Sequence, residues 1–208
     1  MKLYSYVVTH DTGFSPNPFW GCCTLADCKP AIRRTAHVGD WIVGLSPRAS
    51  GNRVVFAMEV DKILDYASYY RDECFADKIP DYTKGEVVYK CGDNIYKPLP
   101  NGGFQQLRSM HSTGERENPE TKAHDLGGTN VLVATRFHYF GTSGPVLPPH
   151  LDELKVGRAH KNRFSRETIS RFRSCSSSQP TLRASTPHRT NGRLATIRGG
   201  RCKNEADS

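Results

Sequence analysis

A stretch near the N-terminus that is rich in glycine, proline and serine predicts a loop, yet it carries three large aromatic rings, Phe14, Phe19 and Trp20. Rings in a loop either plug the protein interior or line a pocket for a planar heterocycle. In the second case, Asp11 or Asn17 would hydrogen-bond the polar edge of that heterocycle. The residue types alone leave both interpretations open.

Basic side chains follow this loop in a segment that predicts a short helix. Lys29, Arg33 and Arg34 lie close together there, and arginine binds phosphate or carboxylate through paired contacts. Taken alone, these side chains are more simply explained as a solvated helix face. Asp93 and Asn94 form a turn pair and are further candidates for ligand contact if the fold brings them to the aromatic loop.

Covalent and acid–base chemistry has a weaker signature. Cys28 precedes the predicted helix and is a candidate nucleophile, but no base stands at a fixed spacing from it. His111, His124 and Asp125 lie in a long polar segment and could serve as acid–base groups if that segment closes over a pocket. Solvated loop residues are the alternative.

Standard cofactor and metal motifs are absent from the sequence. It contains no glycine-rich phosphate loop, no Gly-x-Ser-x-Gly and no His-Glu-x-x-His. The spacing of Cys22, Cys23 and Cys28 is not that of a zinc knuckle, and buried free thiols are favoured. We therefore expect no cofactor and no metal.

The charge of the chain is divided unevenly. Residues 1–154 hold 16 Lys and Arg against 18 Asp and Glu, whereas residues 155–208 hold 13 against 3. The basic character therefore belongs to the C-terminal part, which from about residue 174 is rich in Ser, Arg and Gly without a hydrophobic period. We predict one domain over residues 1–173 and a disordered basic tail over 174–208.

The cellular compartment is indicated by the number of cysteines and by the absence of membrane and secretory segments. An odd number of cysteines, 7, favours a reducing compartment. No apolar run reaches the roughly 18 residues of a membrane span, and the N-terminus has no apolar region of a secretory signal. We expect a cytoplasmic protein without membrane partners.

Short strands separated by frequent turns predict an α+β fold. Strands are expected at 3–8, 41–45, 54–61, 131–135 and 137–140, and a hairpin is expected where 87–90 and 95–97 flank 92–94. Helices are expected after Pro30, after a cap at Asp65, and after a cap at Ser165. Together these elements predict a small mixed or antiparallel β-barrel with short peripheral helices.

Several long strings of this sequence resemble a bacterial family, the type two nucleotide modification associated domain. The resemblance covers about residues 1–165 and is carried by the segments Thr9–Gly21, Cys23–Ala26, Cys28–Arg34, Val38–Gly44 and Lys84–Tyr96. A shorter pattern, a Gly-Asp-Trp strand followed by Val54–Val60, is similar to the PUA/EVE-like small β-barrels, which hold nucleic acid or a modified base among aromatic rings.

The resemblance implies an association with modified nucleotides in DNA, and it assigns no catalytic residues. The chain departs from the family pattern at Gly157–His160, where Ala159 stands in place of an expected glycine. It departs again after Phe172, where the Ser- and Arg-rich end begins.

We therefore expect a binding module. Aromatic rings would stack on a base, Asp11 or Asn17 would read its edge, and Arg33, Arg34 or Arg158 would take phosphate. The expected partners are nucleic acid or a modified nucleotide, and base-modification enzymes. The alternative is an enzyme of nucleotide modification with its reactive groups among His10, Asp11, Cys28 and Lys29, and a third hypothesis is a structural subunit of a larger assembly.

Overall fold

The computed structural model describes residues 1–178, 186–190 and 193–197, and these form two compact units. The first unit holds residues 1–11, 35–63 and 134–178. The second holds residues 12–34, 64–133 and the two C-terminal strands. The chain thus passes between the units several times, and each unit is built from segments far apart in sequence.

The first unit is built on a five-stranded sheet with the order β10-β1-β3-β4-β9. These strands are β1 (Leu3–Val7), β3 (Trp41–Leu45), β4 (Val54–Glu59), β9 (Arg136–Tyr139) and β10 (His160–Lys161). β1 pairs parallel with β3, and the other pairs are antiparallel. β3 is central and every residue in it is buried, as its continuous apolar run predicts.

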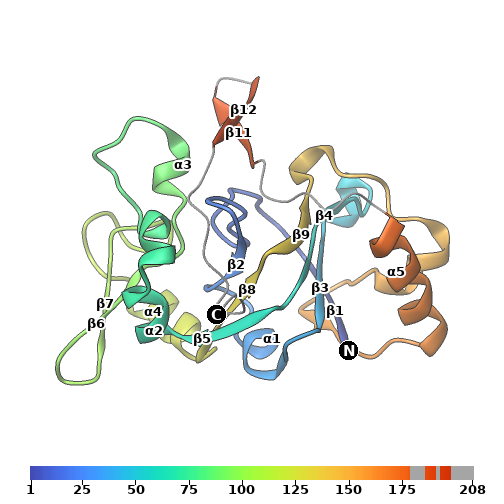
Figure 1. The fold of residues 1–208 in the computed structure, drawn as a ribbon, viewed down its shortest axis with the longest axis horizontal. Helices are drawn as coiled ribbons and strands as arrows, with labels where there is room; N and C mark the ends of the chain where they lie inside the picture. The colour runs from blue at the N-terminus through green and yellow to red at the C-terminus, as the bar shows by residue number, and fades with distance from the viewer. Residues whose placement is uncertain (179–185, 191–192, 198–208) are drawn as a thin grey trace, which may run out of the picture. The chain divides into compact units, whose positions relative to one another are not determined.

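One face of this sheet is covered by the C-terminal helix α5 (Arg166–Ser178), which lies beside β3 and β4 in Figure 1. Phe172 of α5 meets Trp41 of β3 edge-on, with ring centroids 5.3 Å apart. The Ser165 hydroxyl accepts the Thr168 N–H at 3.1 Å, which confirms the predicted cap. Three 3₁₀ turns complete the unit: Arg48–Ser50, Gly141–Ser143 and Pro149–Leu154.

Besides the pair of C-terminal strands, the second unit combines two small sheets with short helices. Its strands are β2 (Cys23–Leu25), β5 (Lys62–Asp65) and β8 (Asn130–Ala134) in the order β2-β8-β5, and the pair β6 (Tyr96–Pro98) and β7 (Phe104–Gln106). Its helices are α1 (Pro30–Thr35), α2 (Tyr66–Arg71), α3 (Val87–Lys90) and α4 (Pro119–Leu126), with a 3₁₀ segment at Glu73–Lys78. A separate core of aromatic and aliphatic residues, including Phe14, Tyr66 and Tyr96, supports them.

The predicted β-barrel is wrong. Within the described residues the strands form four sheets, and none closes, since the large sheet ends in open edges at β10 and β9. The α+β class is confirmed. Strand propensity indicated four of the five strands of the large sheet but carried no information on closure, which depends on how the two outermost strands pair.

The predicted hairpin around residues 92–94 is also wrong. Residues 87–90 form α3, and the hairpin pairs β6 with β7 across Asn101–Gly103 instead. Asp93 and Asn94 are buried, and both are hydrogen-bonded to other segments of the second unit. Tertiary contacts therefore override the local turn preference of this pair.

The C-terminal region extends helix α5 to Ser178, past the predicted boundary at 173/174. β11 (Thr186–Thr190) and β12 (Arg193–Ile197) pair antiparallel. The rest of the predicted tail lies outside the described residues, so the boundary and the disorder stay predictions.

Candidate active site

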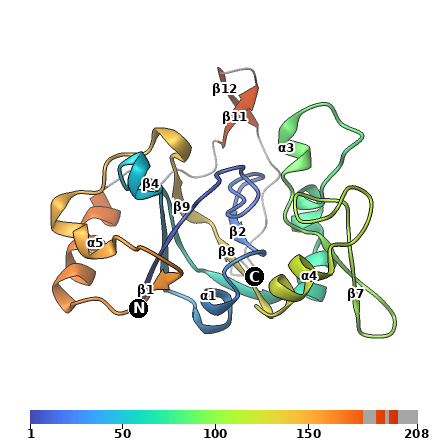
Figure 2. The ribbon, with the colours of Figure 1, turned by 180° about the vertical axis from the view of Figure 1, so that it is seen from behind.

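Cys28 lies on a sharp turn between β2 and α1, two elements labelled in Figure 2. The φ angles of Cys28 and Lys29 are +58° and +41°, in the left-handed region that residues with a side chain rarely adopt. Pro30 then starts α1, where its missing N–H is no loss. Such backbone strain gathers at functional sites, and here it holds a partly exposed thiol at the end of a strand.

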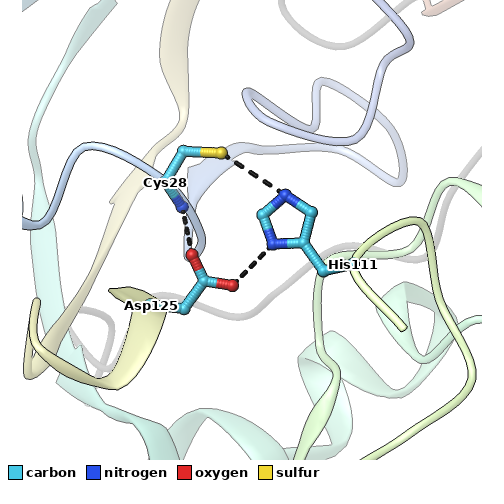
Figure 3. A group of neighbouring side chains, drawn as sticks. All are labelled: Cys28, His111 and Asp125. Atoms are coloured by element: carbon cyan, nitrogen blue, oxygen red, sulfur yellow. Dashed lines mark hydrogen bonds and ion pairs between the residues drawn. The ribbon is translucent and has the colours of Figure 1, made fainter. Parts of the chain in front are cut away.

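The thiol belongs to a chain of three side chains (Figure 3). Cys28 Sγ lies 3.6 Å from His111 Nε2, and His111 Nδ1 lies 2.6 Å from Asp125 Oδ2. The His111 side chain is 19 % exposed and that of Asp125 is fully buried. A nucleophile, a base and a buried carboxylate that orients the base are the parts of a catalytic triad.

Asp125 lies in α4 and is fixed by further donors. Its Oδ1 accepts the backbone N–H of Cys28 at 2.8 Å, and its Oδ2 also accepts the Tyr96 hydroxyl at 2.8 Å. Asn118 caps α4 by accepting the N–H groups of Glu120 and Thr121. The carboxylate is therefore held both by its helix and by the turn that carries the nucleophile.

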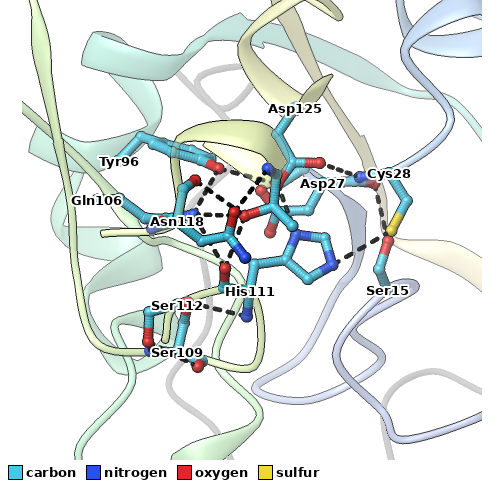
Figure 4. A network of polar contacts seen from close by, with 12 residues as sticks. Ser15, Asp27, Cys28, Tyr96, Gln106, Ser109, His111, Ser112, Asn118 and Asp125 are labelled. Atoms are coloured by element: carbon cyan, nitrogen blue, oxygen red, sulfur yellow. Dashed lines mark hydrogen bonds and ion pairs between the residues drawn. The ribbon is translucent and has the colours of Figure 1, made fainter. Parts of the chain in front are cut away.

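The segment around His111 is held in the same way (Figure 4). The Thr121 hydroxyl donates to the His111 carbonyl at 2.6 Å, and the His111 N–H donates to Ser109 Oγ at 3.2 Å. Gln106 accepts the Asn118 N–H at 2.6 Å and donates to the Tyr96 hydroxyl at 3.2 Å. Contacts from α4 and β7 thus stabilise a loop that would otherwise be mobile.

Arg33 links the turn that carries Cys28 to helix α4. Its Nε donates to the Cys28 carbonyl at 2.7 Å, and its Nη2 donates to the Asp125 carbonyl at 2.5 Å. Nη1 donates to the Tyr66 hydroxyl at 2.6 Å and to the Asn130 carbonyl at 2.8 Å. The guanidinium is fully buried, and a Cβ on Gly128 would come within 2.3 Å of it, so the backbone is shaped around this side chain.

The aromatic loop contributes to the same site. Phe14 is buried, and its ring centroid lies 4.7 Å from that of His111. The Ser15 hydroxyl donates to the Asp27 carbonyl at 2.8 Å. The loop therefore packs against the imidazole and fixes the residue that precedes the nucleophile.

The pKa values of His111, Asp125 and Asp27 are all shifted from their ordinary values, in different directions. Burial lowers the pKa of His111, but hydrogen bonds to Asp125 and Cys28 outweigh it and raise that pKa to about 10. Burial raises the pKa of Asp125, but the hydrogen bond and charge of His111 outweigh it and leave that pKa below its usual value. Burial, and then the charge of Asp125, raise the pKa of Asp27 well above its usual value. These shifts favour an imidazolium at His111, a carboxylate at Asp125 and a carboxylic acid at Asp27.

A metal ion is the other occupant that Cys28, His111 and Asp125 suggest, since one ligand atom from each lies within 4.8 Å of the others. Both ring nitrogens of His111 are already engaged, one by sulfur and one by carboxylate. Both oxygens of Asp125 accept N–H or O–H donors. A metal would have to break these hydrogen bonds, so the arrangement fits a hydrogen-bonded triad better than a metal centre.

Several residues predicted to bind a ligand are instead bound to other parts of the protein. Asn17, Asp93 and Asn94 are buried. Asn17 Oδ1 accepts Lys78 Nζ at 2.7 Å, and Asp93 accepts the hydroxyls of Thr24 at 2.6 Å and Tyr69 at 2.7 Å. The amide of Asn94 donates to the carbonyls of Tyr69 and Phe75. Like Arg33, these groups would have to leave protein partners to bind a ligand.

Phe19 and Trp20, the two rings predicted to stack on a base, lie at the C-terminal end of the aromatic loop. Trp20 is only 6 % exposed, and Phe19 is partly exposed and meets Trp20 edge-on at 5.6 Å. Lys29 is partly exposed beside Cys28 in the chain, and exposed Arg34 donates to the Gly127 carbonyl. Ligand binding by these four residues stays a prediction.

Asp11 and Arg158 belong to the first unit, whereas the other eight predicted ligand contacts belong to the second. Asp11 Oδ1 accepts the Tyr139 hydroxyl at 2.5 Å, and Arg158 is exposed. Their binding to a ligand also stays a prediction.

Sequence analysis singled out Cys28, His111 and Asp125 separately but did not connect them. Cys28 and His111 are 83 residues apart, and no periodicity joins such distant positions. Asp27 and Tyr96 were missed entirely. Helix α4 had a usable signal, because Asn118, Pro119 and Glu120 are a cap, a first-turn proline and a first-turn acid.

Comparison with protein families gives one match. Residues 1–192 match the model of the family described as nucleotide modification associated domain 2, further along the chain than the predicted end near 165. Neither the curated proteins nor the solved structures contain a significant match. In the described part of the chain, no helix combines the length and apolar character needed to cross a membrane.

Proposed function

We propose, on the premise that the chain belongs to the nucleotide modification associated domain 2 family, that Cys28 is the nucleophile of an enzyme in nucleotide modification. The observation that carries the proposal is the continuous contact from Cys28 through His111 to Asp125. Group transfer is one chemistry by which nucleotides are modified, and a thiol in such a triad transfers acyl-type groups through a covalent intermediate.

In the first half of the reaction, Cys28 attacks an electrophilic carbonyl-type carbon of a donor. His111 holds a proton at neutral pH because its pKa is raised to about 10, after hydrogen bonds to Asp125 and Cys28 outweigh the lowering by burial. A Cys28 thiolate would accept a charge-assisted hydrogen bond from that imidazolium. The carbon–sulfur bond forms, the leaving group departs, and His111 gives it the proton.

In the second half, an amine or hydroxyl of the acceptor attacks the thioester. Neutral His111 takes the proton of the acceptor, the new bond to the acyl carbon forms, and the sulfur of Cys28 leaves and recovers its starting state. Asp125 holds the ring of His111 in one tautomer throughout, because its carboxylate accepts Nδ1–H. Water in place of the acceptor gives hydrolysis by the same steps.

The test uses p-nitrophenyl acetate as a generic acyl donor. Wild type should release p-nitrophenol in a burst and carry one acetyl group on Cys28, located by mass spectrometry of tryptic peptides. Cys28→Ser and His111→Gln should each lower the acylation rate by about 100-fold, the lower end expected for loss of a nucleophile or a base. Adding nucleotides that carry an amine or a hydroxyl should then accelerate loss of the acetyl group and yield acetylated nucleotide.

Exposed Cys74 provides the internal control. If Cys28 is acetylated no faster than Cys74, or if His111→Gln leaves the burst unchanged, Cys28 is not an activated nucleophile and the proposal fails. The fold of each variant is checked by thermal unfolding.

Binding of a base beside the aromatic loop is the second candidate function. Its support is the partly exposed ring of Phe19 against Trp20, close in the chain to Lys29, because exposed rings stack on bases for about 1–3 kcal/mol each. Titration of modified and plain oligonucleotides should show tighter binding of the modified form, and Phe19→Ala should weaken it. Equal binding of every oligonucleotide by both proteins contradicts this candidate.

A further inference from the structure

Asp27 has no assigned role in the triad although it directly precedes the nucleophile. Its side chain is fully buried, and neither carboxyl oxygen has a hydrogen-bond partner among the described residues. Its backbone is fixed, since the Asp27 carbonyl accepts Ser15 Oγ. An unpartnered buried polar group is costly and calls for an explanation.

On balance, the surroundings of Asp27 disfavour a negative charge on its carboxyl group. Burial acts most strongly, followed by the charges of Asp125 and Asp93, and these outweigh His111 and Arg33. Their combined effect places the pKa of Asp27 well above its usual range. A buried carboxylate without a hydrogen-bond partner is strongly disfavoured, so the structure favours the protonated form of Asp27, which is a hydrogen-bond donor.

Asp125 has room for one more donor. A carboxylate offers about four acceptor positions, and the structure fills three of those on Asp125, with the Cys28 N–H on Oδ1 and with His111 Nδ1 and the Tyr96 hydroxyl on Oδ2. The open position is on Oδ1. Figure 4 shows Asp27 next to Asp125 in this network.

We propose that Asp27 is a positioning residue of the Cys28–His111–Asp125 triad, a carboxylic acid whose O–H donates to the open position on Asp125. This inference rests on the proposed role of the triad. The hydrogen bond keeps one negative charge between two buried carboxyl groups and holds Asp125 where it meets His111. Asp27 acts through Asp125 and does not touch the reacting atoms.

The experiment measures alkylation of Cys28 by iodoacetamide from pH 6 to pH 10, with exposed Cys74 as a reference in the same sample. Asp27→Asn keeps a neutral donor of the same shape, whereas Asp27→Leu keeps the branching of the side chain and removes the donor. Asp27→Asn should react within about threefold of wild type at each pH. Asp27→Leu should react at least tenfold slower at neutral pH, with its profile displaced, because a hydrogen bond to a charged group is removed.

Two results overturn the inference. If Asp27→Leu reacts like wild type, Asp27 positions nothing. If Asp27→Asn is as slow as Asp27→Leu while its thermal unfolding is unchanged, the chemistry needs the carboxyl group itself rather than a neutral donor.

A second measurement covers the case in which Asp27→Leu does not fold. The infrared carbonyl band of a protonated buried carboxylic acid should be present in wild type at pH 7 and absent in Asp27→Asn. Its absence from wild type overturns the inference. If the band is present but Cys28 reacts no faster than Cys74, the failure belongs to the proposed function and not to the protonation of Asp27.

Discussion

Two polar clusters in the second unit differ in how completely their members are buried and hydrogen-bonded. The Lys78 cluster consists of Lys78, Asn17, Thr24, Tyr69 and Asp93. The Cys28 cluster consists of Cys28, Asp27, Arg33, Tyr96, His111 and Asp125. In the Lys78 cluster every member is fully or almost fully buried, and Lys78 Nζ donates to three oxygens, those of the Asn17 side chain, the Asn17 backbone and the Cys22 backbone.

The Cys28 cluster also contains a fully buried cation, Arg33, but other members of this cluster reach the surface. Arg33 satisfies backbone carbonyls as Lys78 does, whereas Cys28 and His111 are partly exposed and Asp27 has no described partner. A cluster that is closed and satisfied stabilises the fold. One that keeps a partly exposed thiol and a buried carboxyl group without a described partner retains groups that chemistry can use.

Breaking the closed cluster should have the largest effect on stability. Lys78→Met keeps the length of the side chain but leaves the three carbonyl-type oxygens and Asp93 without their cation. The free energy of unfolding should fall by about 3 kcal/mol, measured by urea unfolding. Alkylation of Cys28 per folded molecule should stay unchanged.

Lys84→Met is the matched control, because Lys84 is exposed and pairs with exposed Asp81. Its expected loss is below about 1 kcal/mol. A Lys78→Met protein that is as stable as Lys84→Met would remove the distinction between the two clusters.

Breaking the open cluster should cost less stability and should do so in a pH-dependent way. Burial lowers the pKa of His111, but hydrogen bonds to Asp125 and Cys28 prevail and raise it to about 10 in the folded state, against about 6.5 in the unfolded chain. The folded state therefore binds this proton more tightly. The excess stability of wild type over His111→Gln, about 2 kcal/mol, should be complete below pH 6.5 and fade as the pH rises through about 10.

Urea unfolding at intervals between pH 6 and pH 10 measures this difference. His124→Gln is the control, since His124 is exposed on the same helix as Asp125. An excess stability that grows as the pH rises would contradict the protonated state assigned to His111.

The smallest expected change in stability comes from the backbone, at a residue with a left-handed φ angle outside the two clusters. Ala159 has a φ of +55° on the exposed surface of the first unit, whereas the left-handed angles of Cys28 and Lys29 lie at the candidate site. Because glycine adopts this angle without the strain that a Cβ causes, Ala159→Gly should stabilise the protein by about 0.5–1 kcal/mol. Thermal unfolding measures the gain, and a loss of stability would show that the angle is not strained there.

Local sequence features predicted local structure well. Asp65 caps α2 by accepting the Ser68 N–H at 2.8 Å, and the buried run Trp41–Leu45 forms the central strand β3. These features depend on neighbours in the chain, which the sequence displays directly. The family was also identified from its strings, because an ordered set of unusual residues identifies relatives without any knowledge of the fold.

Features that depend on distant contacts were not predictable. The Cys28–His111 contact, the pairing of β6 with β7 and the open edges of the large sheet all depend on segments that meet only in the folded chain. The aromatic loop shows the limit most clearly. Its composition indicated a site, and the structure places Phe14 against His111, but no pattern in the loop identified an imidazole as its neighbour.

The Arg33 clamp has a consequence for protein engineering. One guanidinium joins the turn of Cys28, the end of α4 and the start of β8. Grafting only the sulfur, imidazole and carboxylate onto another scaffold would omit the side chain that joins the backbones of Cys28 and Asp125. A transplanted site would need Arg33 and the small residue Gly128 as well, so the minimal portable unit comprises five positions rather than three.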